Sequence, residues 1–267
     1  MKKIVFFDAD QTVLDMRTGV PESTRRAIER LVDNGHEAIL CTGRAYSYVP
    51  DELRRMAFTG YIANGGAYIS HQGKILLNVE VDPALALKTV EILRQYRMIP
   101  VLEGTNYMYF DPEEYTDDID HLAVIIREQL GSRFRTIRGN EQRLGIAKCS
   151  AKIRSGISDI DGAIAALTPW YDYIQHYRGM ARWTVEFTVK GHTKGTAVET
   201  LCKALQIPIS ESICFGDSMN DYTMFQACRT KVAMGGSVQD IIDMADFVTD
   251  SMFEDGIQHG LERLGLI

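Results

Sequence analysis

The sequence predicts an α/β fold in which both ends of the chain build one parallel sheet and a separate α+β domain is inserted between them. Near each end of the chain, short apolar runs alternate with helical patterns. This alternation is typical of parallel strands joined by crossover helices. In the middle of the chain, pairs of strand-like runs follow one another with helices between them. We therefore expect a sheet domain over residues 1–80 and 189–267 and an inserted domain over residues 81–188.

The first strand is expected at Ile4–Phe7, where four large apolar residues follow one another without alternation. A run of this kind predicts a strand that is covered on both faces. The helix that follows has its apolar residues on one face and Gly35 at its end. The elements expected up to residue 63 are a helix over about 21–34, a strand over 37–41, a helix over about 47–56 and a short strand over 61–63.

The inserted segment begins after a predicted hairpin, whose strands at 68–69 and 75–77 flank the turn Gln72-Gly73. Apolar residues at helical spacing then alternate with strand-like runs, in the pattern of an α+β domain of ordinary size. The expected helices cover about 83–97, 112–130 and 159–167. The expected strands cover 101–103, 107–110, 144–153, 171–177 and 183–189.

The last part of the chain returns to the α/β rhythm of its beginning. Its expected elements are a helix over 196–205, a strand over 212–215, a helix over 222–227, a strand over 231–234, a helix over 238–244 and a short strand over 247–248. In parallel sheets, functional residues collect at the carboxyl ends of the strands. The residues that follow the predicted strands are therefore the first candidates for a site.

Two of the predicted buried strands end in pairs of acids. Asp8 and Asp10 follow the first strand, and Asp217 and Asp221 follow the strand at 212–215. Carboxylates at the end of a buried strand repel each other and lose hydration, and a bound cation removes both costs. If the two strands are neighbours, these acids meet at one sheet edge and suit Mg²⁺, which prefers oxygen ligands.

Groups that suit a phosphate are expected at the same edge. Thr42 and Gly43 follow the strand at 37–41 and offer a hydroxyl and a backbone N–H at a strand-to-helix turn. Arg44 comes next and is expected either to contact substrate or to form a surface salt bridge. Lys194, where the chain returns to the sheet domain, adds a positive charge. Carboxylates, a cation, a lysine and hydrogen-bond donors form a complete set for phosphoryl transfer.

Four segments resemble, in order and spacing, the four motifs of the haloacid dehalogenase superfamily of phosphatases. The segments are Asp8-Ala9-Asp10-Gln11-Thr12, Thr42-Gly43-Arg44, Thr193-Lys194-Gly195 and Gly216-Asp217-Ser218-Met219-Asn220-Asp221. The insertion between the second and third segments resembles the C2-type α/β cap of the Cof-type subfamily, subclass IIB. Asn64-Gly65-Gly66 and Glu254-Asp255-Gly256 resemble two further signatures of that subfamily. The resemblance covers nearly the whole chain and implies a Rossmann-like parallel-sheet core with an inserted cap.

The resemblance implies a role for each residue of these motifs. Asp8 would attack phosphorus and form an aspartyl-phosphate. Asp10 would protonate the leaving oxygen and later activate water, and Lys194 would stabilise Asp8. The implied phosphate- and substrate-binding set is Thr42, Gly43, Arg44, Lys194 and Asn220.

The cofactor that the resemblance implies is Mg²⁺. The implied metal-binding set is Asp8, Asp10 through its backbone carbonyl, Asp217 and Asp221. One residue departs from the family pattern, because Gln11 stands where the family usually has glycine. Glutamine lacks the conformational freedom that glycine brings to a turn. The departure therefore concerns the shape of the loop after the acids, and its effect on activity is left open.

The function implied is the Mg²⁺-dependent hydrolysis of small phosphomonoesters, such as sugar phosphates or similar metabolites. The cap is expected to close over the core and to determine specificity. Its positive charges at Lys148, Arg138 and Arg143 are candidate substrate contacts. The sequence names neither the substrate nor the oligomeric state.

Composition excludes several other classes of function. The 267 residues are 45% hydrophobic, which is ample for a packed core, and the net charge of −7 argues against nucleic acids and anionic membranes as partners. The five cysteines are scattered without a C-x-x-C pair, as expected of core thiols in a reducing compartment. Acids at positions 8 and 10 interrupt any export signal, and no run is long enough to span a membrane. We expect a cytoplasmic protein whose partner is a small phosphorylated molecule.

Three alternatives remain open from the sequence. A phosphomutase uses the same aspartyl-phosphate and would isomerise a sugar phosphate without releasing phosphate. A phospho-acceptor signalling module also carries a strand-end aspartate, a metal and a lysine, although Asp10 would shorten the lifetime of its phosphoryl group. A catalytically silent phospho-ligand-binding protein would keep the fold, and Gln11 is the residue that favours it.

Overall fold

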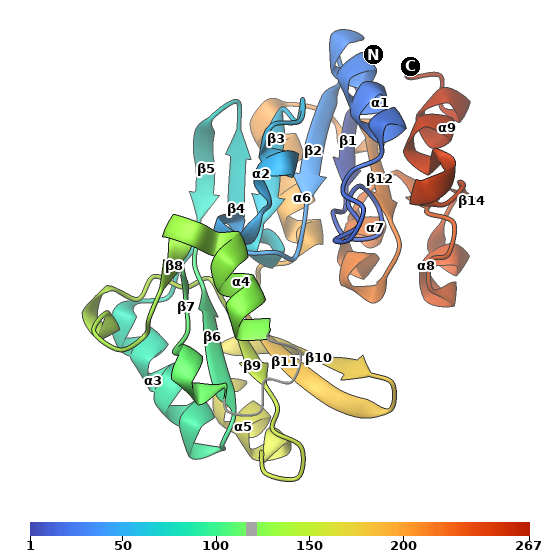
Figure 1. Cartoon of the computed structure of the whole chain (residues 1–267). Helices are drawn as coiled ribbons and strands as arrows, with labels where there is room; N and C mark the ends of the chain where they lie inside the picture. Colours follow the sequence, from blue (N-terminus) through green and yellow to red (C-terminus); the bar gives the residue numbers. More distant parts are fainter. Residues whose placement is uncertain (116–121) are drawn as a thin grey trace. The chain divides into compact units, whose positions relative to one another are not determined.

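The computed structural model describes residues 1–115 and 122–267 of the chain (Figure 1). These residues form two compact units. The first comprises Met1–Gly43, Val49–Leu77 and His192–Ile267, and the second comprises Arg44–Tyr48 and Asn78–Gly191. The α/β class predicted from the sequence is confirmed, because helices alternate with the strands of a mostly parallel sheet in the first unit.

An eight-stranded sheet forms the centre of the first unit. Its order is β14 (Phe247–Val248), β13 (Thr230–Ala233), β12 (Ser212–Gly216), β1 (Ile4–Phe7), β2 (Glu37–Cys41), β3 (Gly60–Ala63), β4 (Tyr68–His71) and β5 (Lys74–Asn78). The strands from β14 to β3 are parallel, and β4 is antiparallel to β3. β1 and β12 come from opposite ends of the chain and are neighbours, with Phe7 opposite Phe215. Both ends of the chain therefore share one sheet, as predicted.

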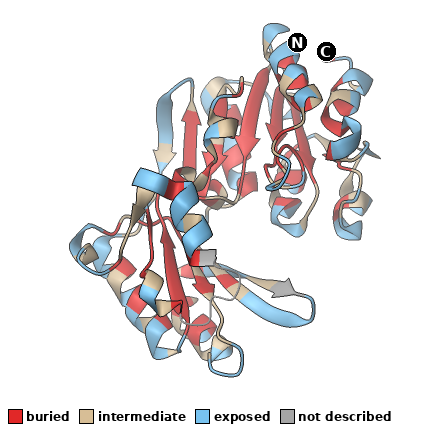
Figure 2. Cartoon of the chain, viewed as in Figure 1, coloured by how far each residue is buried: buried red, intermediate tan, exposed pale blue. Residues whose placement is uncertain are grey.

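Helices cover both faces of this sheet. α6 (Lys194–Leu205), α7 (Tyr222–Ala227) and α8 (Gln239–Met244) pack on the face that carries Phe6. On the other face, α9 (Gly256–Arg263) approaches closely, since a Cβ added to Gly260 would lie 2.5 Å from the ring of Phe215. α1 (Glu22–Asp33) lies beside α9. Every residue of β1 is buried, which matches its unbroken apolar run (Figure 2).

Two elements of the first unit differ from the prediction. The helix expected over about 47–56 is reduced to α2 (Asp51–Arg54), which follows a 3₁₀ turn at Tyr46–Tyr48. Pro50 precedes α2 in an extended conformation, and a proline lacks the N–H of a helix interior and disfavours helical backbone at the residue before it. α9 was not predicted, because the glycines at 256 and 260 lower the helix propensity of its sequence.

A six-stranded sheet forms the centre of the second unit. Its order is β10 (Tyr171–Arg178), β11 (Ala181–Val189), β9 (Lys148–Lys152), β6 (Ile99–Glu103), β7 (Met108–Tyr109) and β8 (Phe134–Arg135). All neighbours are antiparallel except β7 and β8. α3 (Pro83–Gln95) and α5 (Ile160–Leu167) pack on one face, and α4 (Leu122–Leu130) contributes to a separate apolar cluster with residues of β6.

The elements of the second unit follow the prediction with shifted ends. Within the helix expected over 112–130, the structure has a 3₁₀ turn at Pro112–Glu114 and α4, and residues 116–121 lie outside the described residues. The strand expected over 144–153 is confined to β9, and β8 was not predicted because a two-residue strand has no periodicity. Among the described residues, no helix combines the length and the apolar character that crossing a membrane would need.

Candidate active site

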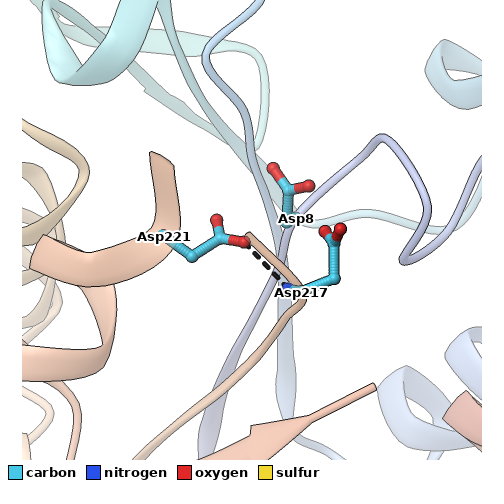
Figure 3. A group of neighbouring side chains, drawn as sticks. All are labelled: Asp8, Asp217 and Asp221. Atoms are coloured by element: carbon cyan, nitrogen blue, oxygen red, sulfur yellow. Dashed lines mark hydrogen bonds between the residues drawn. The ribbon is translucent and has the colours of Figure 1, made fainter. Parts of the chain in front are cut away.

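The site begins where β1 and β12 end side by side in the first unit. Asp8 directly follows β1, is 2% exposed, and donates its backbone N–H to the carbonyl of Phe215 over 3.0 Å. Asp217 directly follows β12. Because parallel neighbours end at the same sheet edge, these two acids and Asp221 bring carboxylate oxygens within 4.8 Å of one another (Figure 3). Of the four acids that were expected to converge, Asp8, Asp217 and Asp221 lie together.

Lys194 lies between two of these acids. Its Nζ is 2.5 Å from Asp8 Oδ1 and 2.6 Å from Asp221 Oδ1, and its side chain is 2% exposed. Lys194 is the first residue of α6, whose start is fixed by a capping box between Thr193 and Thr196. The start of α6 therefore places Lys194 at the carboxyl end of the sheet strands.

Asp221 closes the loop that follows β12. Its Oδ2 accepts hydrogen bonds from the backbone N–H of Asp217 at 3.0 Å and of Ser218 at 3.3 Å. Figure 3 shows the first of these bonds. Its Oδ1 is already held by Lys194. Both oxygens of Asp221 are therefore engaged inside the protein, and its place is to position Lys194 and the loop.

Asp8 and Asp217 keep carboxylate oxygens that are poorly satisfied. Asp8 Oδ2 is buried and has no hydrogen-bond partner among the described residues. Asp217 accepts a long hydrogen bond, 3.4 Å, from the hydroxyl of Thr12. Leaving a buried acceptor unpaired costs free energy, so such an atom in a native fold needs an explanation.

The pKa values of the cluster also indicate that it lacks positive charge. Burial raises the pKa of Asp8 well above its usual value, with the negative charge of Asp221 adding to this and Lys194 opposing it. Burial, followed by the charge of Asp221, raises the pKa of Asp217 to about 7. Burial alone would lower the pKa of Lys194, but attraction to Asp221 and Asp8 outweighs it and the pKa is raised. One lysine does not balance three acids, and hard oxygen donors with an unsatisfied charge suit a divalent cation such as Mg²⁺.

Three further predicted residues, Thr42, Gly43 and Asp10, lie in the loops that follow β2 and β1. Thr42 is buried after β2 and anchored by its N–H to the carbonyl of Ile62. Gly43 lies next to Asn220, because a Cβ added to Gly43 would be 3.9 Å from the Asn220 amide nitrogen. Asp10 is partly exposed in the loop after β1, where its backbone forms a bridge with Leu14.

Arg44 belongs to the second unit. Its guanidinium carbon lies 5.1 Å from the ring centroid of Tyr48, which is within the range of a cation–π contact. Of the substrate-binding residues that the sequence named, Lys194 contacts the acidic cluster directly, and Gly43 and Asn220 are neighbours of each other.

Gln11 adopts the left-handed conformation that makes glycine common at such positions. Its φ is +62°, and its side-chain amide donates to Asp15 Oδ2 over 3.1 Å. The backbone N–H groups of Val13 and Leu14 return to the carbonyl of Ala9, which closes a tight turn. The glutamine therefore takes the backbone shape that a glycine would take, at a cost of the order of 1 kcal/mol.

Gly66 is a positioning residue to which sequence reasoning gave no role. Its φ is +113°, and a Cβ there would lie 2.2 Å from the carbonyl oxygen of Thr193. The turn after β3 therefore packs directly against the residue before Lys194. The signal was present in the Asn64-Gly65-Gly66 segment, but its contact with the start of α6 is a tertiary fact.

Comparison with known proteins agrees with this geometry. A family model described as haloacid dehalogenase-like hydrolase matches residues 5–261. Phosphatase YwpJ of Bacillus subtilis is 26% identical over 297 residues, which cover 98% of this chain and 99% of the relative. The 5-amino-6-(5-phospho-D-ribitylamino)uracil phosphatase YitU of the same organism is 27% identical over 275 residues, which cover 97% of this chain and 96% of the relative.

A solved structure extends the comparison to the fold. The haloalkanoate superfamily phosphatase BT1666 of Bacteroides thetaiotaomicron superposes with a TM-score of 0.82 at 23% identity. The match covers 100% of this chain and 96% of that chain. At this identity the likeness establishes the architecture of core plus inserted unit.

Proposed function

The chain belongs to the haloacid dehalogenase-like hydrolase family, and we propose that it is a Mg²⁺-dependent phosphatase of small phosphomonoesters. The family match over residues 5–261 confirms the resemblance drawn from the four motifs. The observation that carries the proposal is the buried, unpartnered Oδ2 of Asp8 beside Lys194. A carboxylate oxygen that is desolvated, oriented and unpaired is what a nucleophile at phosphorus requires.

Each catalytic step is assigned to a residue of this chain. Lys194 holds Asp8 Oδ1, which orients the carboxylate and favours its ionised form, so that Oδ2 attacks phosphorus and forms an aspartyl-phosphate. Asp10 protonates the leaving oxygen, and in the second half-reaction it takes a proton from the water that hydrolyses the intermediate. Asp10 suits both tasks because its partly exposed position in the loop after β1 allows a proton to be exchanged with solvent.

We propose that four groups bind the phosphoryl oxygens. They are Lys194, the Thr42 hydroxyl, the backbone N–H of Gly43 and the amide of Asn220. The proximity of Gly43 and Asn220 supports this set. Arg44 is kept as a proposed substrate contact from the second unit.

The residues proposed to hold Mg²⁺ are Asp8, Asp217 and the backbone carbonyl of Asp10. Asp221 acts in support, because its two oxygens are already engaged. When bound, the ion neutralises the charge of the transferring phosphoryl group.

The two units are proposed to divide the work. The first unit, with all members of the acidic cluster, performs the chemistry, and the second acts as the cap that selects the substrate. The substrate class proposed is sugar phosphates or similar small metabolites in the cytoplasm. That relatives are named phosphatases supports a phosphorylated substrate. Exchanging residues 78–191 for the corresponding segment of a relative is expected to change substrate preference and to leave metal dependence unchanged.

The test is phosphate release from a panel of small phosphomonoesters, with and without Mg²⁺. Wild type is expected to turn over at least one ester only with Mg²⁺, and Asp8→Asn is expected to lose turnover by roughly 10³-fold or more. Asp33→Asn, an exposed acid at the end of α1, is the matched control and should keep full turnover. Turnover that survives Asp8→Asn would show that the nucleophile is assigned wrongly.

Three further outcomes would identify the alternatives. Isomerised sugar phosphate without net phosphate release would indicate a phosphomutase. Stable phosphorylation of Asp8, with no release over hours, would indicate a phospho-acceptor module. Ligand binding by a folded protein without either reaction would indicate a silent binder, and Gln11→Gly would then be the variant to compare.

A further inference from the structure

A small cavity opens beside the acidic cluster in the first unit. Its volume is about 140 Å³, and two of its lining residues, Gln11 and Asp217, belong to loops of the candidate active site. The other lining residues come from the loops after β13 and β14 and are Gly235, Gly236, Ser251, Met252 and Phe253. None of the reaction steps assigned above uses these five residues.

The walls of the cavity are held together by backbone contacts. The N–H of Gly235 donates to the carbonyl of Asp250 over 3.1 Å, and a Cβ at Gly235 would lie 2.6 Å from the backbone nitrogen of Ser251. Ser251 in turn donates its hydroxyl to Glu254 over 2.8 Å. The two loops are therefore packed so closely that the cavity has a defined shape before any ligand enters.

The lining combines one aromatic face with polar edges. Phe253 is 60% exposed although it lines the cavity, and Gly236 has open space where a side chain would lie. Gln11 and Asp217, both polar, line the cavity on the side of the catalytic loops. Such a surface suits a ring with an apolar face and hydrogen-bonding groups on its edge.

The volume of the cavity is sufficient for one six-membered ring. A protein cavity of roughly 150 Å³ accommodates a single benzene ring. The cavity here is of about that volume, at about 140 Å³, and it is open to solvent at Phe253.

We propose that this cavity binds the ring of the substrate's leaving group, with Phe253 as a specificity-determining residue. The inference rests on the proposed function, in which Asp10 protonates the leaving oxygen. Gln11 follows Asp10 directly and lines the cavity, so the cavity borders the loop that carries the proposed acid. Specificity would then depend on the first unit as well as on the inserted one.

Binding is measured in Asp8→Asn, so that the result does not depend on turnover. The probes are phenyl phosphate and glucose 6-phosphate, which carry an aromatic and a pyranose ring, and glycerol 3-phosphate, which carries none. Adding Phe253→Ala is expected to weaken binding of at least one ring-bearing ester by about tenfold and of glycerol 3-phosphate by less than about twofold. Phe253→Trp should restore the affinity, because it restores the aromatic face.

The matched control is Val248→Ala, an exposed apolar residue of the same unit that does not line the cavity. It should leave all three dissociation constants unchanged. An effect on phenyl phosphate alone would assign the cavity to aromatic rings, and an effect on glucose 6-phosphate alone would assign it to sugars. Equal losses for all three esters, no loss for any, or no binding of any ester would overturn the inference. Turnover that persists in Asp8→Asn overturns the proposed function separately.

Discussion

Each unit of the molecule buries a lysine between two carboxylates, and the two clusters differ in what they leave unpaired. In the first unit, Lys194 contacts Asp8 and Asp221. In the second, Lys148 lies 2.9 Å from Glu186 Oε2 and 3.4 Å from Glu103 Oε2, with the side chains of the lysine and Glu103 no more than 7% exposed. Each cluster therefore sets one buried lysine against two carboxylates.

We call the cluster of the second unit closed because both of its glutamates are paired with Lys148. Glu103 uses its other oxygen to accept the Ser150 hydroxyl over 2.5 Å. Burial alone would raise the pKa of Glu186, but Lys148 and the hydrogen bonds of the cluster outweigh it and lower the pKa to about 2. Strand pairing sets this arrangement, since Glu103 of β6 is directly opposite Lys148 of β9, and Ser150 is opposite Glu186 of β11.

The cluster of the first unit is open. It contains a third acid, Asp217, with a pKa raised to about 7, and the unpartnered Oδ2 of Asp8. The comparison teaches that a buried charge does not by itself indicate function. Between these two clusters, the unpartnered carboxylate oxygen of Asp8 makes the difference. The comparison also changes the expectation for Lys148, whose ammonium group is held by two glutamates rather than offered to a substrate.

The largest expected difference between the clusters is in turnover. Lys194→Met should lower kcat/KM by roughly 10²–10³-fold, because it removes the cation that orients Asp8 and stabilises phosphoryl charge. Lys148→Met should change the rate of the chemical step by less than about threefold, since it holds only the inserted unit together. Steady-state kinetics with circular dichroism as a folding control measure both. Equal losses in kcat for the two variants would remove the distinction.

The next effect is on stability. Lys148→Met leaves two buried glutamates without their counter-charge and should lower the free energy of unfolding by about 3–5 kcal/mol. Lys190→Met, at an exposed position in the same unit, is the control and should change it by less than about 0.5 kcal/mol. Urea denaturation of both variants provides the measurement. A stability equal to wild type in Lys148→Met would mean that the cluster contributes no net pairing energy.

Asp217 and Glu186, one acid from each cluster, should respond to pH with opposite signs in metal-free protein. Asp217 has a folded pKa of about 7 against an ordinary 3.8, so its contribution to stability is present below pH 3.8 and is lost as pH rises through 7. Glu186 has a folded pKa of about 2 against 4.5, so its contribution is present above pH 4.5 and is lost as pH falls towards 2. At full size these shifts correspond to about 4 kcal/mol for Asp217 and about 3 kcal/mol for Glu186.

Unfolding free energies measured in chelator between pH 3 and pH 8 test these signs. Asp217→Asn should remove the loss on the alkaline side, and Glu186→Gln should flatten the loss on the acid side. Suppose instead that the wild type gains stability steadily up to pH 8 and that Asp217→Asn does not change the slope. This result would contradict the raised pKa of Asp217.

The smallest effect is expected when the closed cluster is replaced as a whole. The triple variant Glu103→Leu, Lys148→Met and Glu186→Leu should lie within about 1 kcal/mol of wild type, because apolar residues of similar size often replace a buried ion-pair network without loss. Thermal unfolding of the triple variant beside Lys148→Met measures it. If the triple variant were as unstable as the single one, the cluster would be required for the fold itself.

Patterns among neighbouring residues were enough to predict many of the helices, strands and turns. The unbroken apolar run of β1, the one-sided helix α1 and the turn Gln72-Gly73, where both residues have positive φ, are features of neighbouring residues and were predicted correctly. Pro50 shortened a predicted helix, and the two glycines of α9 concealed another. The proline acts through its own backbone geometry, whereas α9 was decided by packing, since a helix with weak propensity persists when its neighbours bury it.

The sequence by itself determined which strands would end in acids and that a lysine would lie where the chain returns to the sheet domain, because both features can be read from neighbouring residues. Only the tertiary structure decided which carboxylate oxygen has no partner. The bond between Lys194 and Asp8 joins residues 186 positions apart, and that between Thr12 and Asp217 joins residues 205 positions apart. These two contacts form only when both ends of the chain meet in one sheet, with β1 beside β12.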